Sequence, residues 1–373
     1  MNYLSQGFSE FRELLKKWKL SDAELLINKL NEDEYPVATL ELAETVSKLW
    51  DTRKGYQLCL SIKNYEFDEV ELQYKFNFLF VNSLIWLGEL EEAEVELADW
   101  VKKYSLSTTS ANLKEDIVDN KFSWLVSFTR AQLLLSKGDY DQAIQEFTHI
   151  LNLNVGMKGT YYESEFLLGI AYAYYFKGKI NDSFHYMNES HDQAVSNKNV
   201  PAKILSSLGL AFLYQNKGQL DLSIKTLEET ENYLKEHSLP FPSFVLAMPS
   251  HSLARISLAK NDFKTAQTHL LKSLSQFKTI DEKDAFWLPD IIFDAIRTHT
   301  ELNKIEEAKA YLSKLKNLQA SESKVGKYRV MVAEALILLQ GKRLYQKMKA
   351  YSLLKEAIDS NVGFAELEKY LLS

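Results

Sequence analysis

The sequence predicts an all-α protein, arranged as a solenoid of about eight or nine helical hairpins. Three observations predict this class. Glycine and proline are scarce for a chain of 373 residues, at 13 and 6. Apolar residues recur at three- and four-residue steps, which is the periodicity of helices. One short pattern also recurs along the chain, as it does in proteins built from stacked repeats.

The recurring pattern centres on a turn residue that is glycine or asparagine in each of its clear copies: Gly88, Gly138, Gly178, Gly218, Asn261 and Asn303. These two residue types enter the left-handed conformation that ends a helix most easily. Five residues later each copy has a small residue: Ala93, Ala143, Ser183, Ser223, Ala266 and Ala308. A small side chain lets two helix backbones approach closely. Each copy therefore predicts a helix, a tight turn and a second helix.

Weaker copies flank this region. We expect turns at Trp18 and Trp50, each followed by a small residue, Ala23 or Gly55. The segment "SLSTTSANLKED" (105–116) reads as an inserted loop and flexible joint, and "FAELEKYLLS" (364–373) as a capping helix. Pro249 lies inside an expected helix and should kink it or delay its start.

These boundaries predict three regions. Residues 1–72 form divergent hairpins or an output bundle, 73–320 the regular repeats, and 321–373 a divergent repeat with its cap.

Composition excludes several classes of function. The net charge of −7 gives no reason to expect nucleic acid, which usually leaves a basic footprint. The start of the chain lacks a signal-peptide pattern. The longest uncharged apolar run, "FLLGIAYAYYF" (166–176), is too short to span a bilayer. Cys59 is the single cysteine, which rules out an intramolecular disulfide. We therefore expect a cytoplasmic protein that does not bind membranes.

No motif predicts catalysis, a cofactor or a metal. The glycine turns lack the lysine, the Ser/Thr and the preceding strand of a phosphate loop, and "GDYDQ" stops short of a calcium loop. His185, Glu189 and His191 come nearest to a metal set, but His191 points away from the face that the other two share. We expect these three residues to be ordinary surface residues.

The segments "GDYDQAIQEF" and "SLGLAFLYQNKGQLDLSI" resemble tetratricopeptide repeats, and the resemblance covers roughly residues 76–315. The spacing of about 40 residues exceeds that family's usual 34. Repeats of this length are similar to those of bacterial peptide-pheromone receptors and of the sensor region of large signal-responsive transcription activators. HEAT-type repeats come second, because their proline–aspartate–arginine pattern is missing.

The resemblance implies a right-handed superhelix whose first helices line a concave groove. Family geometry puts groove sites thirteen, ten, six, three and two residues before each turn. From these sites we select the candidate binding residues Lys75, Asn82, Gln132, Tyr172, Tyr175, Asn216, His251, Arg255, Asp290 and Arg297. Asn82, Gln132, Arg255 and Arg297 are expected to be accessible. Whether the rings among the groove positions, such as Phe78 and Phe128, are exposed or packed stays open.

An apolar floor with amides and arginines suits an extended peptide or a docked helix. His251, Arg255 and Arg297 would favour an acidic group or a free chain terminus. We therefore expect a non-catalytic protein- or peptide-binding scaffold. The alternative is a pheromone-receptor-like sensor whose superhelix changes shape when a peptide or small ligand binds. A homodimer is one option for either function, and an enzyme carrying helical repeats is a further rival without a supporting motif.

Overall fold

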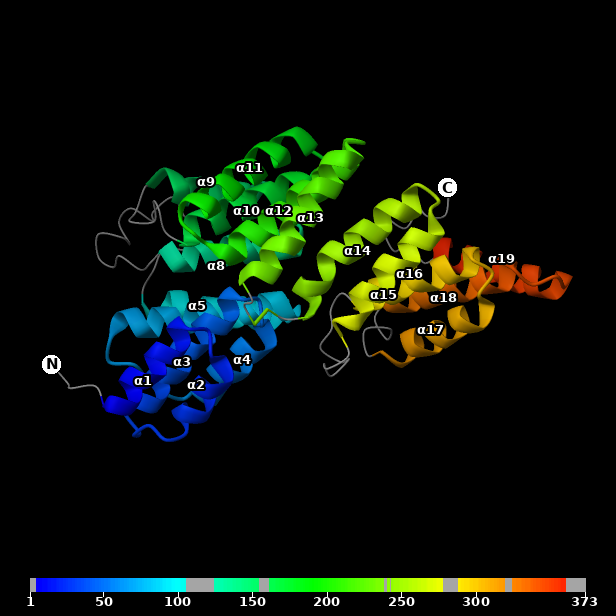
Figure 1. Ribbon diagram of the computed structural model, residues 1–373. Coiled ribbons are helices and arrows are strands. Elements are labelled where there is room, and N and C mark those ends of the chain that lie inside the picture. Colours follow the sequence, from blue (N-terminus) through cyan, green and yellow to red (C-terminus); the bar gives the residue numbers. More distant parts are fainter. Residues whose placement is uncertain are drawn as a thin grey trace. The chain divides into compact units, whose positions relative to one another are not determined.

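The computed structural model describes residues 5–104, 124–153, 161–237, 240–241, 243–277, 288–318 and 324–359. Within these ranges all regular secondary structure is helical, and eighteen helices follow one another as hairpins (Figure 1). The predicted all-α class and the predicted number of hairpins are confirmed. The expected joint at 105–116 and the expected capping helix at 364–373 lie outside the described residues.

The chain divides into two compact units, which are described separately. The N-terminal unit comprises Met1–Gly218 and Tyr233–Pro242, and the C-terminal unit comprises Gln219–Asn232 and Ser243–Ser373. The division falls within one helix, α13 (Leu220–His237), so this helix contributes to both units. It does not coincide with the boundaries expected near residues 72 and 320.

The N-terminal unit contains five consecutive helix pairs and the first helix of a sixth. Their helices are α1 (Gln6–Lys16) and α2 (Leu20–Ile27), α3 (Glu34–Lys48) and α4 (Thr52–Ser61), α5 (Val70–Leu87) and α6 (Leu90–Lys103), α8 (Trp124–Lys137) and α9 (Tyr140–Leu153), α10 (Tyr161–Phe176) and α11 (Ile180–Ser196), and α12 (Val200–Asn216). Pro201 stands in the first turn of α12, where its missing N–H costs little.

The C-terminal unit contains the first part of α13 and three complete hairpins. The hairpin helices are α14 (Ser243–Ala259) and α15 (Phe263–Ser275), α16 (Leu288–Glu301) and α17 (Ile305–Asn317), and α18 (Lys324–Leu339) and α19 (Leu344–Asp359). Pro249 lies in the interior of α14. Of the two outcomes expected for Pro249, a kink or a delayed helix start, the delayed start does not occur, because α14 already begins at Ser243.

The predicted turn residues adopt the left-handed conformation. Gly138 has a φ of 89°, and the backbone N–H groups of Gly138 and Asp139 donate to the carbonyls of Leu135 and Leu134. These bonds satisfy carbonyls that the end of α8 would otherwise leave unpaired. Even the two tryptophans predicted as turn residues have positive φ angles, 57° at Trp18 and 64° at Trp50.

The small residues lie where the helices of a hairpin touch. Ala93, Ala143, Ser183, Ala266 and Ala308 have no exposed surface. At Gly55, an added Cβ would come within 2.5 Å of the Ser47 hydroxyl on α3. Close helix contact therefore explains the small residue in the repeat.

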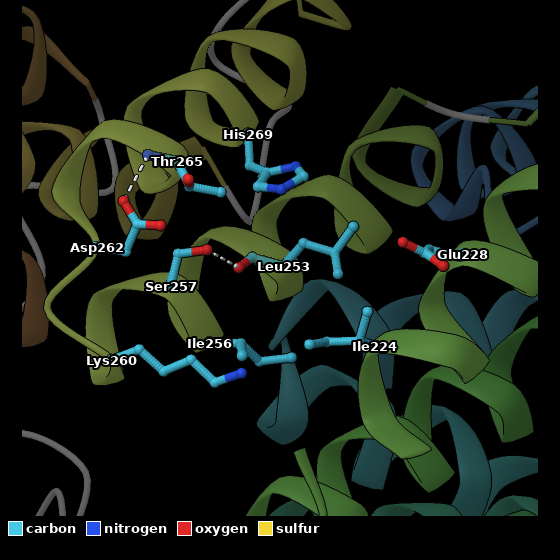
Figure 2. A pocket seen from close by; sticks show the side chains of 9 residues that line it. All are labelled: Ile224, Glu228, Leu253, Ile256, Ser257, Lys260, Asp262, Thr265 and His269. Atoms are coloured by element: carbon cyan, nitrogen blue, oxygen red, sulfur yellow. Dashed lines mark hydrogen bonds between the residues drawn. The ribbon is translucent and has the colours of Figure 1, made fainter. Parts of the chain in front are cut away.

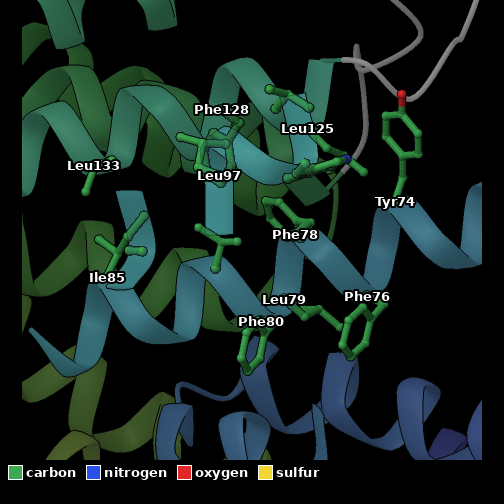
Figure 3. Packing of buried hydrophobic residues seen from close by; sticks show 14 of the residues in the cluster. Tyr74, Phe76, Phe78, Leu79, Phe80, Ile85, Leu97, Leu125, Phe128 and Leu133 are labelled. Carbon is green, nitrogen blue, oxygen red and sulfur yellow. The ribbon is translucent and has the colours of Figure 1, made fainter. Parts of the chain in front are cut away.

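A large aromatic cluster forms the core of the N-terminal unit around α5 (Figure 3). Phe76 and Phe80 leave one side of this helix, and Phe78 leaves another to reach Phe128 on α8 at a ring-centroid distance of 5.6 Å. Because α5 is buried on several faces, its apolar residues are distributed around nearly the whole helix. The C-terminal unit has a core of its own, built from α14 to α19.

None of the described helices combines the length and apolar character that a membrane crossing requires.

Candidate ligand-binding face of the first helices

The position ten residues before each turn belongs to the core. Phe78, Phe128, Leu168, Leu208 and Phe293 are all buried between helices. Phe128 packs edge-on against Phe166 at 4.7 Å between ring centroids, which ties α8 to α10. The apolar groove floor left open by the sequence is thus packing surface between successive repeats.

Asn82 and Gln132 are also buried, with 9% and 7% of their surface exposed. The Asn82 amide donates to the Phe78 carbonyl at 2.9 Å and to the Thr129 hydroxyl at 3.0 Å, so it joins α5 to α8. The expectation that these two amides would be accessible is wrong. First helices of neighbouring repeats pack closely here, and a buried amide must find partners inside the protein.

Lys75 is half-buried and its charge already has a partner. Its ammonium lies 2.9 Å from a carboxylate oxygen of Glu44 on α3, and Lys48 approaches the same carboxylate at 2.8 Å. Burial works to raise the pKa of Glu44, but the two lysines lower it below its ordinary value. Lys75 therefore links successive first helices.

Three more candidates of the N-terminal unit lie along α10 and α12. Tyr172 and Tyr175 are half-buried. Burial, with a smaller contribution from Glu165, raises the pKa of Tyr172 to about 12, so its hydroxyl stays protonated. The Tyr175 ring contacts Phe212 at 5.1 Å. Asn216 is exposed, and its amide donates to the Phe212 carbonyl at 3.1 Å. Of these three candidates, only Asn216 is exposed.

In the C-terminal unit, the remaining candidates come together with two residues that the sequence did not indicate. We call this group the arginine cluster: His251 and Arg255 on α14, Asp290, Asp294 and Arg297 on α16, and Arg329 on α18. His251 Nε2 and Asp294 Oδ2 form a hydrogen bond of 2.9 Å. Arg329 forms a salt bridge with Asp290, with 2.7 Å between its guanidinium nitrogen and the Oδ1 of Asp290. Both bonds join neighbouring first helices.

The charges of the arginine cluster are coupled. Burial works to raise the pKa of Asp294, but the His251 hydrogen bond and the charges of His251, Arg255 and Arg297 lower it below its ordinary value. The pKa of Asp290 is instead raised above its ordinary value, because the effect of burial exceeds the opposing effect of the Arg329 charge. Three guanidinium groups act on the two carboxylates: those of Arg255 and Arg297 lower the pKa of Asp294, and that of Arg329 acts to lower the pKa of Asp290.

Sequence reasoning missed Asp294 and Arg329 because neither occupies a groove position of the repeat. Asp294 follows Asp290 by one helical turn, and two acidic residues at this spacing with three apolar residues between them were a usable signal. Arg329 has no such signal, since it lies outside the clear copies of the pattern. Arg255 and Arg297 are half-buried rather than fully accessible.

Other candidate chemistry is weak in the described residues. His185 Nε2 and Glu189 Oε2 are 3.9 Å apart, and no group of three His, Cys, Asp or Glu side chains in the described ranges is placed to hold a metal ion. Cys59 is buried and its pKa is raised to about 12 by burial, which keeps the thiol protonated and unreactive.

Solved structures show the same fold. The crystal structure of NprR in complex with its cognate peptide NprX matches with a TM-score of 0.56 and 18% identity, covering 91% of this chain and 92% of that one. A Rap protein complexed with competence and sporulation factor matches with a TM-score of 0.58 and 13% identity, covering 98% and 92%. Aspartyl phosphate phosphatase F from Bacillus subtilis matches with a TM-score of 0.56 and 14% identity, covering 95% of this chain and 86% of that one.

At these identities the likeness extends to the fold alone. A search of curated proteins finds no match for the sequence. A family model does match, and it covers residues 125–371, which is most of the chain from α8 onward. The helical hairpins, the left-handed turns and the small contact residues agree with that match. The chain therefore belongs to the family described as the MalT-like TPR region.

Proposed function

We propose that this protein is a non-catalytic peptide-binding protein, and that the first helices of the C-terminal unit receive an acidic group of the peptide. The observation that carries the proposal is the arginine cluster. Arg255 and Arg297 lie at equivalent positions of successive repeats, both half-buried and both close enough to lower the pKa of Asp294. Guanidinium groups in such a site bind carboxylates with well-defined geometry.

The guanidinium groups of Arg255 and Arg297 give the cluster a means to bind an anion, because both are half-buried and not fully enclosed. A guanidinium group has five N–H donors, so it can bind a further carboxylate beside the partners that it has within the protein. A carboxylate from a peptide side chain or C-terminus would bind there in a partly desolvated place, where ion pairs are stronger than at the surface. Two of the similar structures contain a peptide or a factor, which supports a peptide as the ligand.

The same contacts argue against a general-acid role for Asp294. His251 and Asp294 form an acid–imidazole pair, and the charges of Arg255 and Arg297 also stabilise the ionised form of Asp294. A carboxylate held in this way is a poor general acid. Since one of the similar structures is a phosphatase, hydrolysis of an aspartyl phosphate is the activity to assay first.

A charge-reversal experiment tests the site. The probe is a synthetic pool of pentapeptides with free C-termini, captured on the immobilised full chain and identified by mass spectrometry. We expect Arg255→Glu with Arg297→Glu to abolish retention of the peptides that the wild type selects. The matched control, Lys225→Glu with Lys264→Glu, makes the same change of net charge on exposed second helices of the same unit.

The pair Arg255→Lys with Arg297→Lys keeps the charge and loses the bidentate geometry, so its retention should fall by only about ten-fold. Circular dichroism verifies that each variant is folded. If the double glutamate variant retains the same peptides as the wild type, the site is refuted.

The alternative of a peptide-sensing regulator is favoured by the division of the chain into two units that share α13. For a sensor, small-angle scattering should record a change of the radius of gyration when a selected peptide is added. A passive scaffold should keep its radius of gyration within error.

A further inference from the structure

The C-terminal unit has a hollow between its helices. It has a volume of about 220 Å³ and is lined by residues of α13, α14 and α15 (Figure 2). All nine lining residues belong to the C-terminal unit. The floor is apolar, formed by Ile224, Leu253 and Ile256, and polar side chains including Glu228 and Lys260 surround it.

The hollow lies away from the arginine cluster. Ser257, one of its lining residues, follows Arg255 by two positions on α14. Two residues turn a helix by about 200°, so these side chains leave opposite sides of α14. The hollow is therefore a separate feature from the proposed peptide site.

The reason for the hollow is visible when repeats are compared at the position four residues before the turn. Three repeats carry an aromatic ring there: Tyr174, Tyr214 and His299. In the repeat of Asn261 the same position is Ser257. The Ser257 hydroxyl turns back to donate to the Leu253 carbonyl at 3.0 Å, so it leaves the space beside it unfilled.

The rings of the other repeats each pack against a neighbouring side chain. One partner comes from the preceding repeat, six residues after its turn: Phe184, which follows Gly178, contacts the Tyr214 ring at 5.3 Å between centroids. The position eight residues after the same repeat's turn is another, because Tyr186 stacks on Tyr174 at 5.5 Å and Tyr311 contacts His299 at 5.1 Å. In the hollow these two positions are Ile224 and His269, and both line it.

Lysines at one position can also be compared. Lys217, one residue before its turn, places its ammonium 4.3 Å from the centroid of Phe184, the ring that packs against Tyr214 and corresponds to Ile224 in the hollow. Lys260 has the same position in its own repeat and lines the hollow. In Figure 2 its side chain extends toward Ile256, along the floor. Burial, aided by Lys272, lowers the pKa of His269, which leaves a neutral imidazole as the ring-contacting surface.

We propose that the hollow between Ile224, Ser257 and His269 is a binding site for a phenolic ring, which takes the place of the aromatic side chain that the neighbouring repeats supply themselves, Tyr214 in one and His299 in the other. A cavity of about 150 Å³ lined by apolar side chains is known to hold benzene, so the space suffices for a ring with a substituent. Lys260 contributes a cation–π contact and His269 an aromatic one. The ring can belong to a free phenol or to a tyrosine of a partner.

The test uses the full chain with p-cresol as the probe, titrated by saturation-transfer NMR. Ser257→Tyr fills the hollow with the chain's own ring, so we expect its affinity for p-cresol to fall by about ten-fold or more and its Tm to rise. Lys260→Ala removes the cation–π contact at an exposed position and should weaken binding by about two- to five-fold without loss of folding.

Two further probes define the ligand. 4-Methylcyclohexanol has the shape of p-cresol without the aromatic ring, and we expect it to bind more weakly than p-cresol. An acetylated and amidated Gly-Tyr-Gly peptide tests whether a tyrosine within a chain enters the hollow. Binding of this peptide assigns the site to a partner's tyrosine, and binding of p-cresol alone assigns it to a free phenol.

The proposal is overturned if neither ring compound binds, or if the wild type and Ser257→Tyr bind p-cresol equally. Equal binding of 4-methylcyclohexanol and p-cresol would overturn the aromatic part of the assignment. Should Ser257→Tyr not fold, unchanged binding of p-cresol by Lys260→Ala contradicts the proposed contacts.

Discussion

Lys198 shows how a single residue stores strain at a repeat junction. It lies between α11 and α12 with a φ of 54°, in the left-handed region that non-glycine residues enter at a cost. Its side chain is exposed. The backbone N–H of Asn199 donates to the Ala194 carbonyl at 2.8 Å, and this turn holds Lys198 in place.

We expect Lys198→Gly to stabilise the protein by about 0.5 to 1 kcal/mol, because glycine adopts this conformation without the Cβ clash. Urea unfolding measures the difference. Lys198→Ala is the matched control, since it removes the exposed side chain and keeps the Cβ. Equal stabilities for the glycine and alanine variants would show that the backbone is not strained.

Asp294 is the residue on which the arginine cluster depends. Replacing it with asparagine removes the buried counter-charge that lies 2.9 Å from His251, so we expect Asp294→Asn to destabilise the fold by about 3 kcal/mol at neutral pH. The matched control is Asp192→Asn on the exposed face of α11, which should have a small effect. Urea unfolding at pH 7 decides between these outcomes.

The same residue predicts a pH dependence. The pKa of Asp294 is held below its ordinary value of 3.8, so its ionised form stabilises the fold above that pH. This contribution is lost as the pH falls from about 3.8 through the folded-state pKa. We expect the wild type to lose stability in this window more steeply than Asp294→Asn; parallel curves would contradict the lowered pKa.

At the scale of helices, two glycines determine how closely successive repeats pack. A Cβ added at Gly169 on α10 would meet the Phe147 ring at 2.6 Å, and one added at Gly209 on α12 would meet the end of Met187 at 2.5 Å. Both partners are the apolar residue that follows the turn by nine positions. Close approach thus occurs between repeats as well as within each hairpin.

The nature of the neighbour predicts different costs for the same substitution. Gly169→Ala pushes against a rigid ring enclosed by Phe128 and Phe166, so we expect a net destabilisation of about 1 to 2 kcal/mol. Gly209→Ala meets a flexible thioether that can rotate, and the better helix propensity of alanine should make it nearly neutral. Thermal unfolding of both variants provides the comparison, and equal losses would contradict this explanation.

At the scale of the whole molecule, the two units have separate cores. The cluster around α5 belongs to the N-terminal unit, and the cluster from α14 to α19 belongs to the C-terminal unit. In stacked repeats, stability passes mainly between nearest neighbours. A local defect should therefore weaken its own unit first.

Hydrogen exchange with mass spectrometry tests this expectation. Gly169→Ala should speed the exchange of amides in α8 to α11 and leave α16 to α18 nearly unchanged. Asp294→Asn should speed the exchange of amides in α16 to α18 and leave α8 to α11 nearly unchanged. Equal effects on both units from either substitution would show that the chain unfolds as one cooperative body.

Much of the fold could be predicted from the sequence because the residues that define each repeat are close together in the chain. A left-handed turn residue such as Gly138 and a small contact residue such as Ala143 act within one hairpin, and their spacing is visible in the chain. This is why even Trp18 and Trp50, which are poor left-handed residues, could be identified as turns from their place in the pattern.

The candidate site could be predicted only in part, because exposure depends on neighbouring repeats. Spacing placed Asn82 and Arg255 at the same position of their repeats. Only the packing of α5 against α8 made Asn82 a buried bridge to Thr129, while Arg255 is half-buried. Asp294 and Arg329 joined the cluster through contacts between helices that lie far apart in the chain.

The helices, the turns and the small contact residues could be identified from the sequence, since they depend on side chains a few positions apart. Which polar groups meet, and where a hollow remains, depends on how the helices pack against one another. Ser257 is an example: a serine in place of a ring is an ordinary substitution in the sequence, and a hollow results only because Ile224 and His269 from other helices line the same space.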